Sequence, residues 1–267
     1  MIRAVFFDLD GTLLSPVTGF CSPATKTALF EMKKKGIRLF VATGRSPYEF
    51  TLSPIIEGLP FDAIVALNGL CCYDSEGIIY QRLFDKEDLA LLIDKVKAVN
   101  CPCMIIMKDD MYINFINDHV REAHAAIHSP MPRVGELSDA MDQDVIMTMV
   151  YHPVGEDADD TLSVLKKSHA TRWHPYSVDV VPNGCSKKTG IDQVLNKYGI
   201  SWDEVMAFGD GENDQKMLQS AKIGVAMGNS DEILLGGEFY VTGDADKDGI
   251  VTALKHFGLI DNEEEGL

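Results

Sequence analysis

Short apolar runs alternate with longer polar segments along the first part of the chain. Residues 2–7 form an almost unbroken apolar run, which is typical of a strand buried on both faces of a parallel sheet. Residues 37–42 and 63–67 form two similar runs. Ser22-Pro23 precedes a helical segment at residues 24–35, and Ser46-Pro47 opens another; a Ser-Pro pair is a common helix start. This order of elements predicts right-handed parallel crossovers.

The pattern changes between residues 84 and 183. Strand pairs separated by tight turns are mixed there with helical segments, which favours an antiparallel sheet with helices on one face. We therefore predict a separate α+β unit over residues 84–183. Its expected helices lie at residues 89–99, 118–127 and 159–167, and its expected strands lie at residues 103–107, 111–115, 145–151, 171–174 and 178–181.

The parallel pattern returns after residue 183, so the α+β unit is predicted to be an insertion. The expected fold class is α/β, with a doubly wound parallel-sheet, Rossmann-like core made of residues 1–83 and 184–267. A hairpin at residues 71–81 ends the first half of this core. The expected elements of the second half are helices at 188–198, 213–220, 231–235 and 249–257, and strands at 205–208 and 223–226.

Two carboxylates follow the first strand directly, in the segment Asp8-Leu9-Asp10-Gly11-Thr12. Side chains two residues apart on an extended chain leave on the same side. Like charges that close repel each other unless a cation lies between them, and a hard divalent ion such as Mg²⁺ prefers oxygen ligands. The alternative is an ordinary strand-ending turn, in which Asp and Gly are common.

Three further polar loops are predicted beside the core strands. Thr43-Gly44 follows the second strand and offers a hydroxyl and backbone N–H groups at the start of a helix, where an anion is favoured. Gly209 to Asp214 follows the strand at 205–208, and Ser186-Lys187-Lys188 opens a helix. Each loop alone could be a turn, a helix cap or a solvated lysine. Together, at one edge of a parallel sheet, they indicate an active site.

Charge and cysteine usage restrict the classes of partner. The chain has 24 basic and 41 acidic residues, a net charge of −17, which disfavours nucleic acid and anionic membranes as partners. Its six cysteines contain no CxxC pair, so free thiols in a reducing cytoplasm are expected. We expect no secretory leader, and no apolar stretch in the sequence approaches membrane-spanning length. We expect a cytoplasmic protein without a membrane partner, and the sequence does not indicate its oligomeric state.

These motifs, in this order, resemble those of the haloacid dehalogenase superfamily of phosphatases, specifically its type IIB, Cof-like branch of sugar-phosphatase-like enzymes. The resemblance covers nearly the whole chain and places the cap domain of that branch at residues 84–183. The motifs are carried by Asp8-Leu9-Asp10-Gly11-Thr12, Thr43-Gly44-Arg45, Lys187, and Gly209-Asp210-Gly211-Glu212-Asn213-Asp214.

The resemblance implies a Mg²⁺-dependent phosphomonoester hydrolase that works through an aspartyl-phosphate. Asp8 is the implied nucleophile. Asp10 is the implied acid that protonates the leaving oxygen and the base that then activates water. The implied metal site consists of Asp8, the backbone carbonyl of Asp10 and Asp210, with Asp214 orienting a metal-bound water or Lys187.

The same resemblance implies the groups that bind phosphate. Thr43, Gly44 and Lys187 are expected to hold the phosphoryl oxygens, with Asn213 contacting the phosphate or the rest of the substrate. The family commonly has glycine after the motif lysine, whereas Lys188 stands there in this chain. Lys187 is the lysine that we expect to reach the phosphate. The expected substrates are small phosphorylated metabolites, with sugar phosphates foremost.

Two other functions share some of these features. A phosphomutase of the same superfamily would use Asp8 but return the phosphoryl group to its substrate, and a requirement for a sugar bisphosphate would identify it. A phosphoacceptor signalling module would also combine acidic residues with Thr and Lys. Such modules lack a carboxylate at the position of Asp10 and a large inserted domain, so this alternative is disfavoured.

Two further patterns resemble metal sites but are better explained otherwise. Residues 244–249 imitate the first half of a calcium-binding loop, yet Lys255 stands where a bidentate glutamate is required. A helix-capping loop is expected instead. His124 and His128 lie four apart on a predicted helix without a recognisable partner motif, so a solvated helix face is expected there.

Overall fold

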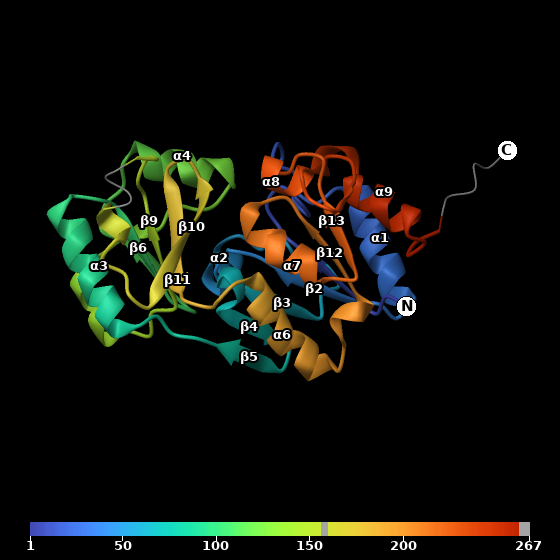
Figure 1. Cartoon of the computed structure of the whole chain (residues 1–267), viewed down its shortest axis with the longest axis horizontal. Helices are drawn as coiled ribbons and strands as arrows, with labels where there is room; N and C mark the ends of the chain where they lie inside the picture. The colour runs from blue at the N-terminus through green and yellow to red at the C-terminus, as the bar shows by residue number, and fades with distance from the viewer. Residues whose placement is uncertain (156–159, 262–267) are drawn as a thin grey trace.

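The computed structural model describes residues 1–155 and 160–261. Figure 1 shows two lobes, one containing α3, α4 and the strands β6, β9, β10 and β11, the other containing the sheet with β12 and β13. Within the described residues, eight strands form the sheet of the larger lobe and six form the other. Among these residues, no helix is both long enough and apolar enough to cross a bilayer.

The larger sheet has the order β14-β13-β12-β1-β2-β3-β4-β5. Its strands from β14 to β3 pair in parallel, and the hairpin β4–β5 adds two antiparallel strands at one edge. The first-half elements are β1 (Ala4–Phe7), α1 (Pro23–Lys34), β2 (Arg38–Ala42), α2 (Pro47–Leu52), β3 (Ala63–Ala66), the short 3₁₀ helix η1 (Leu67–Gly69), β4 (Cys71–Asp74) and β5 (Gly77–Gln81). The second-half elements are α6 (Lys187–Tyr198), η3 (Trp202–Glu204), β12 (Val205–Gly209), η4 (Glu212–Asp214), α7 (Gln215–Ser220), β13 (Ile223–Ala226), α8 (Glu232–Leu235), β14 (Tyr240–Val241), η5 (Ala245–Lys247) and α9 (Gly249–His256).

The central strands of the larger sheet are buried on both faces, which explains their unbroken apolar runs. On β1, Val5 and Phe7 face one hydrophobic cluster, to which α1 and α9 contribute. Ala4 and Phe6 face the opposite cluster, to which α6 and α7 contribute. A strand with alternate side chains in two cores has no solvated face and therefore shows no polar alternation. The doubly wound α/β core is confirmed.

The smaller sheet has the order β10-β11-β9-β6-β7-β8. All its pairs are antiparallel except β7 with β8. Its lobe contains α3 (Lys86–Ala98), β6 (Cys103–Ile106), β7 (Met111–Ile113), α4 (Asp118–Ala126), β8 (Arg133–Val134), η2 (Leu137–Asp142), β9 (Met147–Val150), β10 (Ser168–His174) and β11 (Ser177–Pro182).

The smaller sheet carries helices on both faces, so the expectation of one covered face was wrong. Cys103 and Ile105 pack in the cluster formed with α3 and η2. Met104 and Ile106 pack in a cluster that also contains Val120 of α4 and Leu67 of η1 from the larger lobe. The second face is thus covered partly by α4 and partly by the core. The sequence of the short strands in this lobe does not indicate how much of one sheet face the neighbouring lobe covers.

The chain passes between the lobes twice. The first passage joins β5 to α3, and the second joins β11 to α6. The boundaries proposed at residues 83/84 and 183/184 fall inside these two connections and stay a prediction. The helix expected at 159–167 begins outside the described residues, and helical structure within them ends at residue 162. The helix expected at 213–220 is divided into η4 and α7.

Candidate active site

The polar loops meet because β1 is paired on both sides. Phe7 is aligned with Val41 of β2 and with Phe208 of β12. The backbone N–H of Asp8 donates to the carbonyl of Phe208 over 3.0 Å. The loops that begin at residues 8, 43 and 209 therefore leave the same edge of the sheet.

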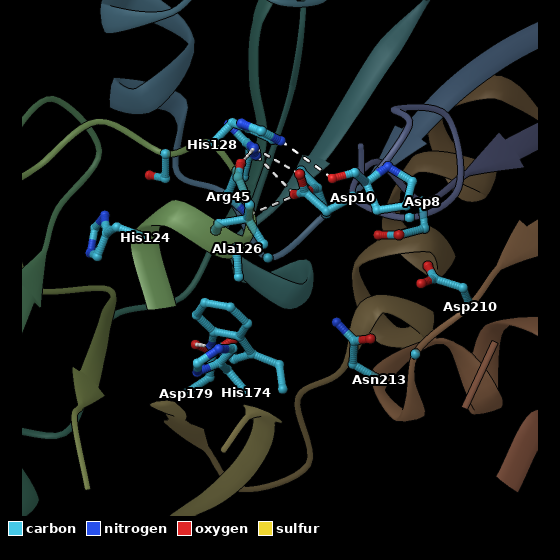
Figure 2. Close-up of a pocket in the computed structure, with 18 of the residues that line it drawn as sticks. Asp8, Asp10, Arg45, His124, Ala126, His128, His174, Asp179, Asp210 and Asn213 are labelled. Carbon is cyan, nitrogen blue, oxygen red and sulfur yellow. Dashed lines mark hydrogen bonds and ion pairs between the residues drawn. The ribbon is translucent and has the colours of Figure 1, made fainter. Parts of the chain in front are cut away.

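Three carboxylates form a cluster at this edge. Oxygen atoms of Asp8, Asp210 and Asp214 all lie within 4.8 Å of one another, and Figure 2 shows Asp8 and Asp210 side by side. The Thr12 hydroxyl donates to Asp210 Oδ1 over 2.8 Å. Oxygen atoms at this spacing form a donor set suited to a hard divalent cation.

Lys187 lies inside the cluster. Its Nζ donates to Asp8 Oδ1 over 2.5 Å and to Asp214 Oδ1 over 2.7 Å, and its side chain is 1% exposed. Lys188 instead pairs with Asp192 on the outer side of α6. The neighbouring lysine therefore does not compete with Lys187 for the site.

Asp214 is fully engaged by protein groups. Besides the bond from Lys187, its Oδ2 accepts the backbone N–H groups of Asp210 and Gly211, each over 3.1 Å. Asp214 thus fixes both the lysine and the loop that carries Asp210. This arrangement suits a role in orienting Lys187 and the Asp210 carboxylate.

One lysine does not neutralise the cluster. Burial, followed by the charge of Asp214, raises the pKa of Asp8 to about 7, and Lys187 only partly opposes this. Burial and the charge of Asp8 raise the pKa of Asp210 well above its ordinary value. For Lys187, burial lowers the pKa, but the charges of Asp214 and Asp8 outweigh it and the net shift is upward. A divalent cation would relieve the remaining repulsion.

Gly11 permits the close approach of the first and last motifs. Its φ is +83°, and a Cβ atom at this position would lie 2.1 Å from Asp210 Oδ2. Any other residue would meet both backbone strain and a clash with a cluster carboxylate.

The loop expected to bind phosphate lies beside a chain of amide contacts. The buried Thr43 side chain accepts the backbone N–H of Arg45 over 3.0 Å. Asn213 Nδ2 donates to Asn68 Oδ1 over 3.1 Å, and Asn68 Nδ2 donates to Asp179 Oδ2 over 2.6 Å. Asn213 is thereby linked through η1 to Asp179 on β11 of the smaller lobe.

A cavity of about 310 Å³ opens above the carboxylates between the two lobes. The larger lobe contributes Asp8, Asp10 and Gly44 to its lining, and the smaller lobe contributes His174 and Asp179. Thr43, Asp210 and Asn213 also line it. All the predicted site residues except Lys187 and Asp214 line this cavity, and those two support Asp8 from beneath it.

Sequence reasoning missed the residues that contact Asp10. Arg45 donates from Nε to Asp10 Oδ2 over 2.8 Å and from Nη2 to Asp10 Oδ1 over 2.7 Å (Figure 2). The Arg45 side chain is 4% exposed, whereas that of Asp10 is 26% exposed. Burial lowers the pKa of Arg45, but the hydrogen bond and charge of Asp10 outweigh it and the net shift is upward. Arg45 belongs to the Thr43-Gly44-Arg45 motif, but its position in the sequence did not predict that it pairs with Asp10.

A family model described as haloacid dehalogenase-like hydrolase matches residues 5–254. The chain belongs to this family. It is a phosphatase of the type IIB, Cof-like branch.

Its relatives include curated phosphatases and solved structures. The putative phosphatase YkrA of Bacillus subtilis is 28% identical over 259 residues, which cover 97% of this chain and 98% of that protein. The 5-amino-6-(5-phospho-D-ribitylamino)uracil phosphatase YitU of the same organism is 26% identical, with 95% and 96% covered. The structure of the HAD subclass IIB sugar phosphatase BT4131 is 32% identical with a TM-score of 0.88, covering 97% of this chain and all of that one.

Of the two histidines that we expected on a solvated helix face, His124 on α4 is buried, whereas His128 is exposed but lies beyond the end of that helix. His124 is buried, its Nε2 lies 2.7 Å from the Tyr151 hydroxyl, and its Nδ1 lies 3.0 Å from the Pro130 carbonyl oxygen. Burial lowers the pKa of His124 to about 4. His128 lines the cavity near the carbonyl of Pro16. The spacing of residues in the sequence predicted the helix. Which face of the helix is buried depends on how the smaller lobe packs against the larger one.

Asp179 gives this phosphatase a testable pH dependence of stability. Burial raises its pKa from 3.8 to about 7, against the lowering effects of the Asn68 and Trp173 hydrogen bonds. Between these values the folded protein keeps a proton that the unfolded chain releases. Stability therefore falls as pH rises, by up to about 1.4 kcal/mol per pH unit.

Comparison with the Asp179→Asn variant isolates this contribution because the titrations common to both proteins largely cancel. We expect the wild-type free energy of unfolding, relative to that of the variant, to be higher at about pH 5 than at about pH 8, by on the order of 1–3 kcal/mol. Urea unfolding at the two pH values measures the difference. A difference of opposite sign would mean that Asn68 and Trp173 hold Asp179 ionised in the folded state.

Proposed function

We propose that this phosphatase is a Mg²⁺-dependent phosphomonoester hydrolase that acts on small phosphorylated metabolites, chiefly sugar phosphates, through an aspartyl-phosphate on Asp8. One observation carries the proposal. Asp8 lies where a buried lysine, two further carboxylates and a cavity between two lobes meet. A carboxylate nucleophile needs such surroundings, because the incoming phosphate is itself an anion.

The residues at this edge fit a magnesium ion. Asp8 and Asp210 would hold it through carboxylate oxygens and Asp10 through its backbone carbonyl, while Asp214 would orient Lys187 and the loop of Asp210. Bound Mg²⁺ would neutralise charge on the phosphoryl group and on its attacking oxygen.

Asp8 attacks phosphorus in line with the departing oxygen, and the phosphorus–oxygen bond to the leaving group breaks as the bond to Asp8 forms. Asp10 donates a proton to the leaving oxygen and afterwards accepts one from the water that hydrolyses the aspartyl-phosphate. Asp10 is suited to this exchange because its side chain is partly exposed and lines the cavity.

The phosphoryl oxygens are held by groups around the same edge. Lys187 offers a buried cation, Thr43 a hydroxyl, and Gly44 a position on the cavity wall. Asn213 lines the cavity and contacts the phosphate or the adjoining part of the substrate. These groups supply positioning and charge compensation, which account for most of the catalysis of phosphoryl transfer.

The size of the cavity supports a small metabolite as substrate. A volume of about 310 Å³ is at the lower end for small-molecule sites. YitU and BT4131 are named for a phosphorylated ribitylamino compound and for sugar phosphates, respectively. All six cysteines are buried with free thiols, which supports the reducing cytoplasm as its location.

Phosphate release from a panel of phosphorylated metabolites, measured with and without Mg²⁺, tests the proposal directly. Sugar phosphates should release phosphate only with the metal. Stoichiometric return of the phosphoryl group to a sugar, with dependence on a bisphosphate, would instead identify a mutase. Failure of every phosphomonoester in the presence of Mg²⁺ would overturn the proposed function.

Asp210→Asn provides a sharper test of the metal site. The change removes one ligand charge but leaves Asp8 in place, so the Mg²⁺ concentration for half-maximal activity should rise about 10- to 100-fold. The exposed Asp203, at the opposite end of β12, provides the matched control Asp203→Asn. An Asp210→Asn variant with the wild-type Mg²⁺ dependence would contradict the assignment.

A further inference from the structure

Arg45 is a buried cation that the proposed chemistry has not used. It follows β2 in the loop Thr43-Gly44-Arg45, and the Thr43 hydroxyl fixes its backbone N–H. A guanidinium that is 4% exposed requires partners for its charge and for its N–H groups. Its partners therefore indicate what the residue is for.

The first partner is the carboxylate proposed as acid and base. Arg45 bonds both oxygens of Asp10, over 2.8 and 2.7 Å, in the paired geometry that a guanidinium and a carboxylate favour. Such a pair fixes the plane of the carboxylate as well as its position. Asp10 still lines the cavity, so a leaving group can reach it.

The second partner belongs to the other lobe. Arg45 Nη2 also donates a short hydrogen bond to the backbone carbonyl of Ile127, which caps the C-terminal end of α4. Carbonyls at this end of a helix lack intrahelical donors and carry partial negative charge. One guanidinium thus joins the smaller lobe to Asp10.

The contact of Ile127 is part of a continuous junction between the lobes. Ser129 donates from its hydroxyl to Glu49 Oε1 over 2.7 Å, and Glu49 Oε2 accepts the backbone N–H of Ser46. His128, between Ile127 and Ser129 in the sequence, lines the cavity near Pro16. Residues 127–129 therefore contact the loops that follow β1 and β2 as well as helix α2.

We propose that Arg45 is a positioning residue that couples the seating of residues 127–129 on the core to the orientation of Asp10. When the lobes meet, Ile127 and Asp10 share the guanidinium and Asp10 is aligned with the leaving group. When the lobes part, Arg45 loses its bond to the Ile127 carbonyl. It then no longer holds the Asp10 carboxylate in a fixed position. Protonation of the leaving group is thereby confined to the closed cavity, where the substrate is enclosed. This inference rests on the proposed function of Asp10.

The test is the dependence of kcat/KM on the leaving group, measured with Mg²⁺ on aryl phosphates of graded phenol acidity and on one alkyl phosphate. A strongly acidic phenol departs without a proton, whereas an alcohol requires one. Arg45→Lys keeps the charge but loses the paired geometry. We expect kcat/KM to fall about 100-fold for the alkyl phosphate and less than about 3-fold for the most acidic phenol. A steeper dependence on phenol acidity is the signature of lost positioning.

Two further variants separate this role from a structural one. Ser129→Ala removes the neighbouring contact between the lobes and should steepen the dependence in the same direction by a smaller amount. Arg38→Gln removes another Arg–Asp pair from β2, the one with Asp62 at the opposite end of the strand, and should leave the dependence unchanged. If Arg45→Lys fails to fold, Ser129→Ala carries the test.

Each remaining outcome overturns the inference. Equal loss on all esters would make Arg45 a phosphate-binding group, and faster alkyl phosphate hydrolysis would mean that it holds Asp10 away from the substrate. An unchanged dependence in both Arg45→Lys and Ser129→Ala would exclude the coupling. These results differ from failure of the proposed function, in which the wild-type protein would hydrolyse no ester of the series.

Discussion

Replacement of Asp8 by asparagine is expected to abolish phosphate release, with a loss on the order of 10⁴-fold or more. The amide cannot attack phosphorus, and no other carboxylate of the cluster occupies the same place. Asp210 is bonded to Thr12, and Asp214 to Lys187 and two backbone N–H groups. Neither can replace Asp8 as the nucleophile.

The same variant should be more stable than the wild type when no metal is present. Folding raises the pKa of Asp8 from 3.8 to about 7. Ionisation of this residue therefore reduces the free energy of unfolding, and the full reduction applies above about pH 7. Asparagine carries no such cost. The gain should be fully present at about pH 8, on the order of 1–3 kcal/mol, and shrink as pH falls toward about 4.

Steady-state phosphate release and urea unfolding in EDTA measure the two effects on one preparation. Asp203→Asn, which removes a charge far from the cluster, should change neither. Residual turnover of the Asp8→Asn variant within about 10-fold of the wild type would exclude Asp8 as the nucleophile. A loss of metal-free stability would mean that the pair with Lys187 outweighs the burial and repulsion of the carboxylates.

The parallel core could be predicted because each of its strands and turns is specified by a short, continuous stretch of sequence. Each strand is a short apolar run, and the turn after it carries the polar motif, so strand ends and chemistry appear together in the sequence. Pairing of β1 with β2 and β12 then brings the loops to one edge. The residues that form the carboxylate cluster were accordingly all named from sequence.

Contacts between the lobes could not be predicted in the same way. Arg45 meets Ile127, and Asn68 meets Asp179, across more than 80 and more than 100 residues, respectively. Neither pair belongs to one motif, and no period links them. Asp179 did offer one signal, a carboxylate within the apolar strand β11. A buried acid in such a strand indicates a specific partner, although the sequence does not name it.

Replacement of Asp10 by asparagine should separate the two halves of the reaction. Asparagine keeps the approximate size of the side chain and leaves the backbone carbonyl unchanged, so substrate and metal binding should persist. Its amide cannot donate a proton as an acid or accept one as a base. Loss of a positioned acid and base costs on the order of 10²–10⁴-fold, and the leaving group decides which half-reaction suffers first.

With the phosphate ester of a strongly acidic phenol, Asp8 should still be phosphorylated, because this leaving group needs little protonation. Breakdown of the aspartyl-phosphate requires deprotonation of water and should slow by about 10²-fold or more. The intermediate then accumulates, seen as a burst of phenol equal to the enzyme present and as a phosphoryl adduct on the peptide that contains Asp8.

With an alkyl phosphate the same variant should show no burst, since the first step now lacks its acid as well. Rapid-quench measurements on both esters, with wild-type protein as control, give the comparison. Loss of the Asp10 carboxylate also removes both of its bonds to Arg45, so the comparison must distinguish lost proton transfer from a structural effect. A structural effect would slow both esters alike and leave no adduct, and the two-step role of Asp10 would then have to be abandoned.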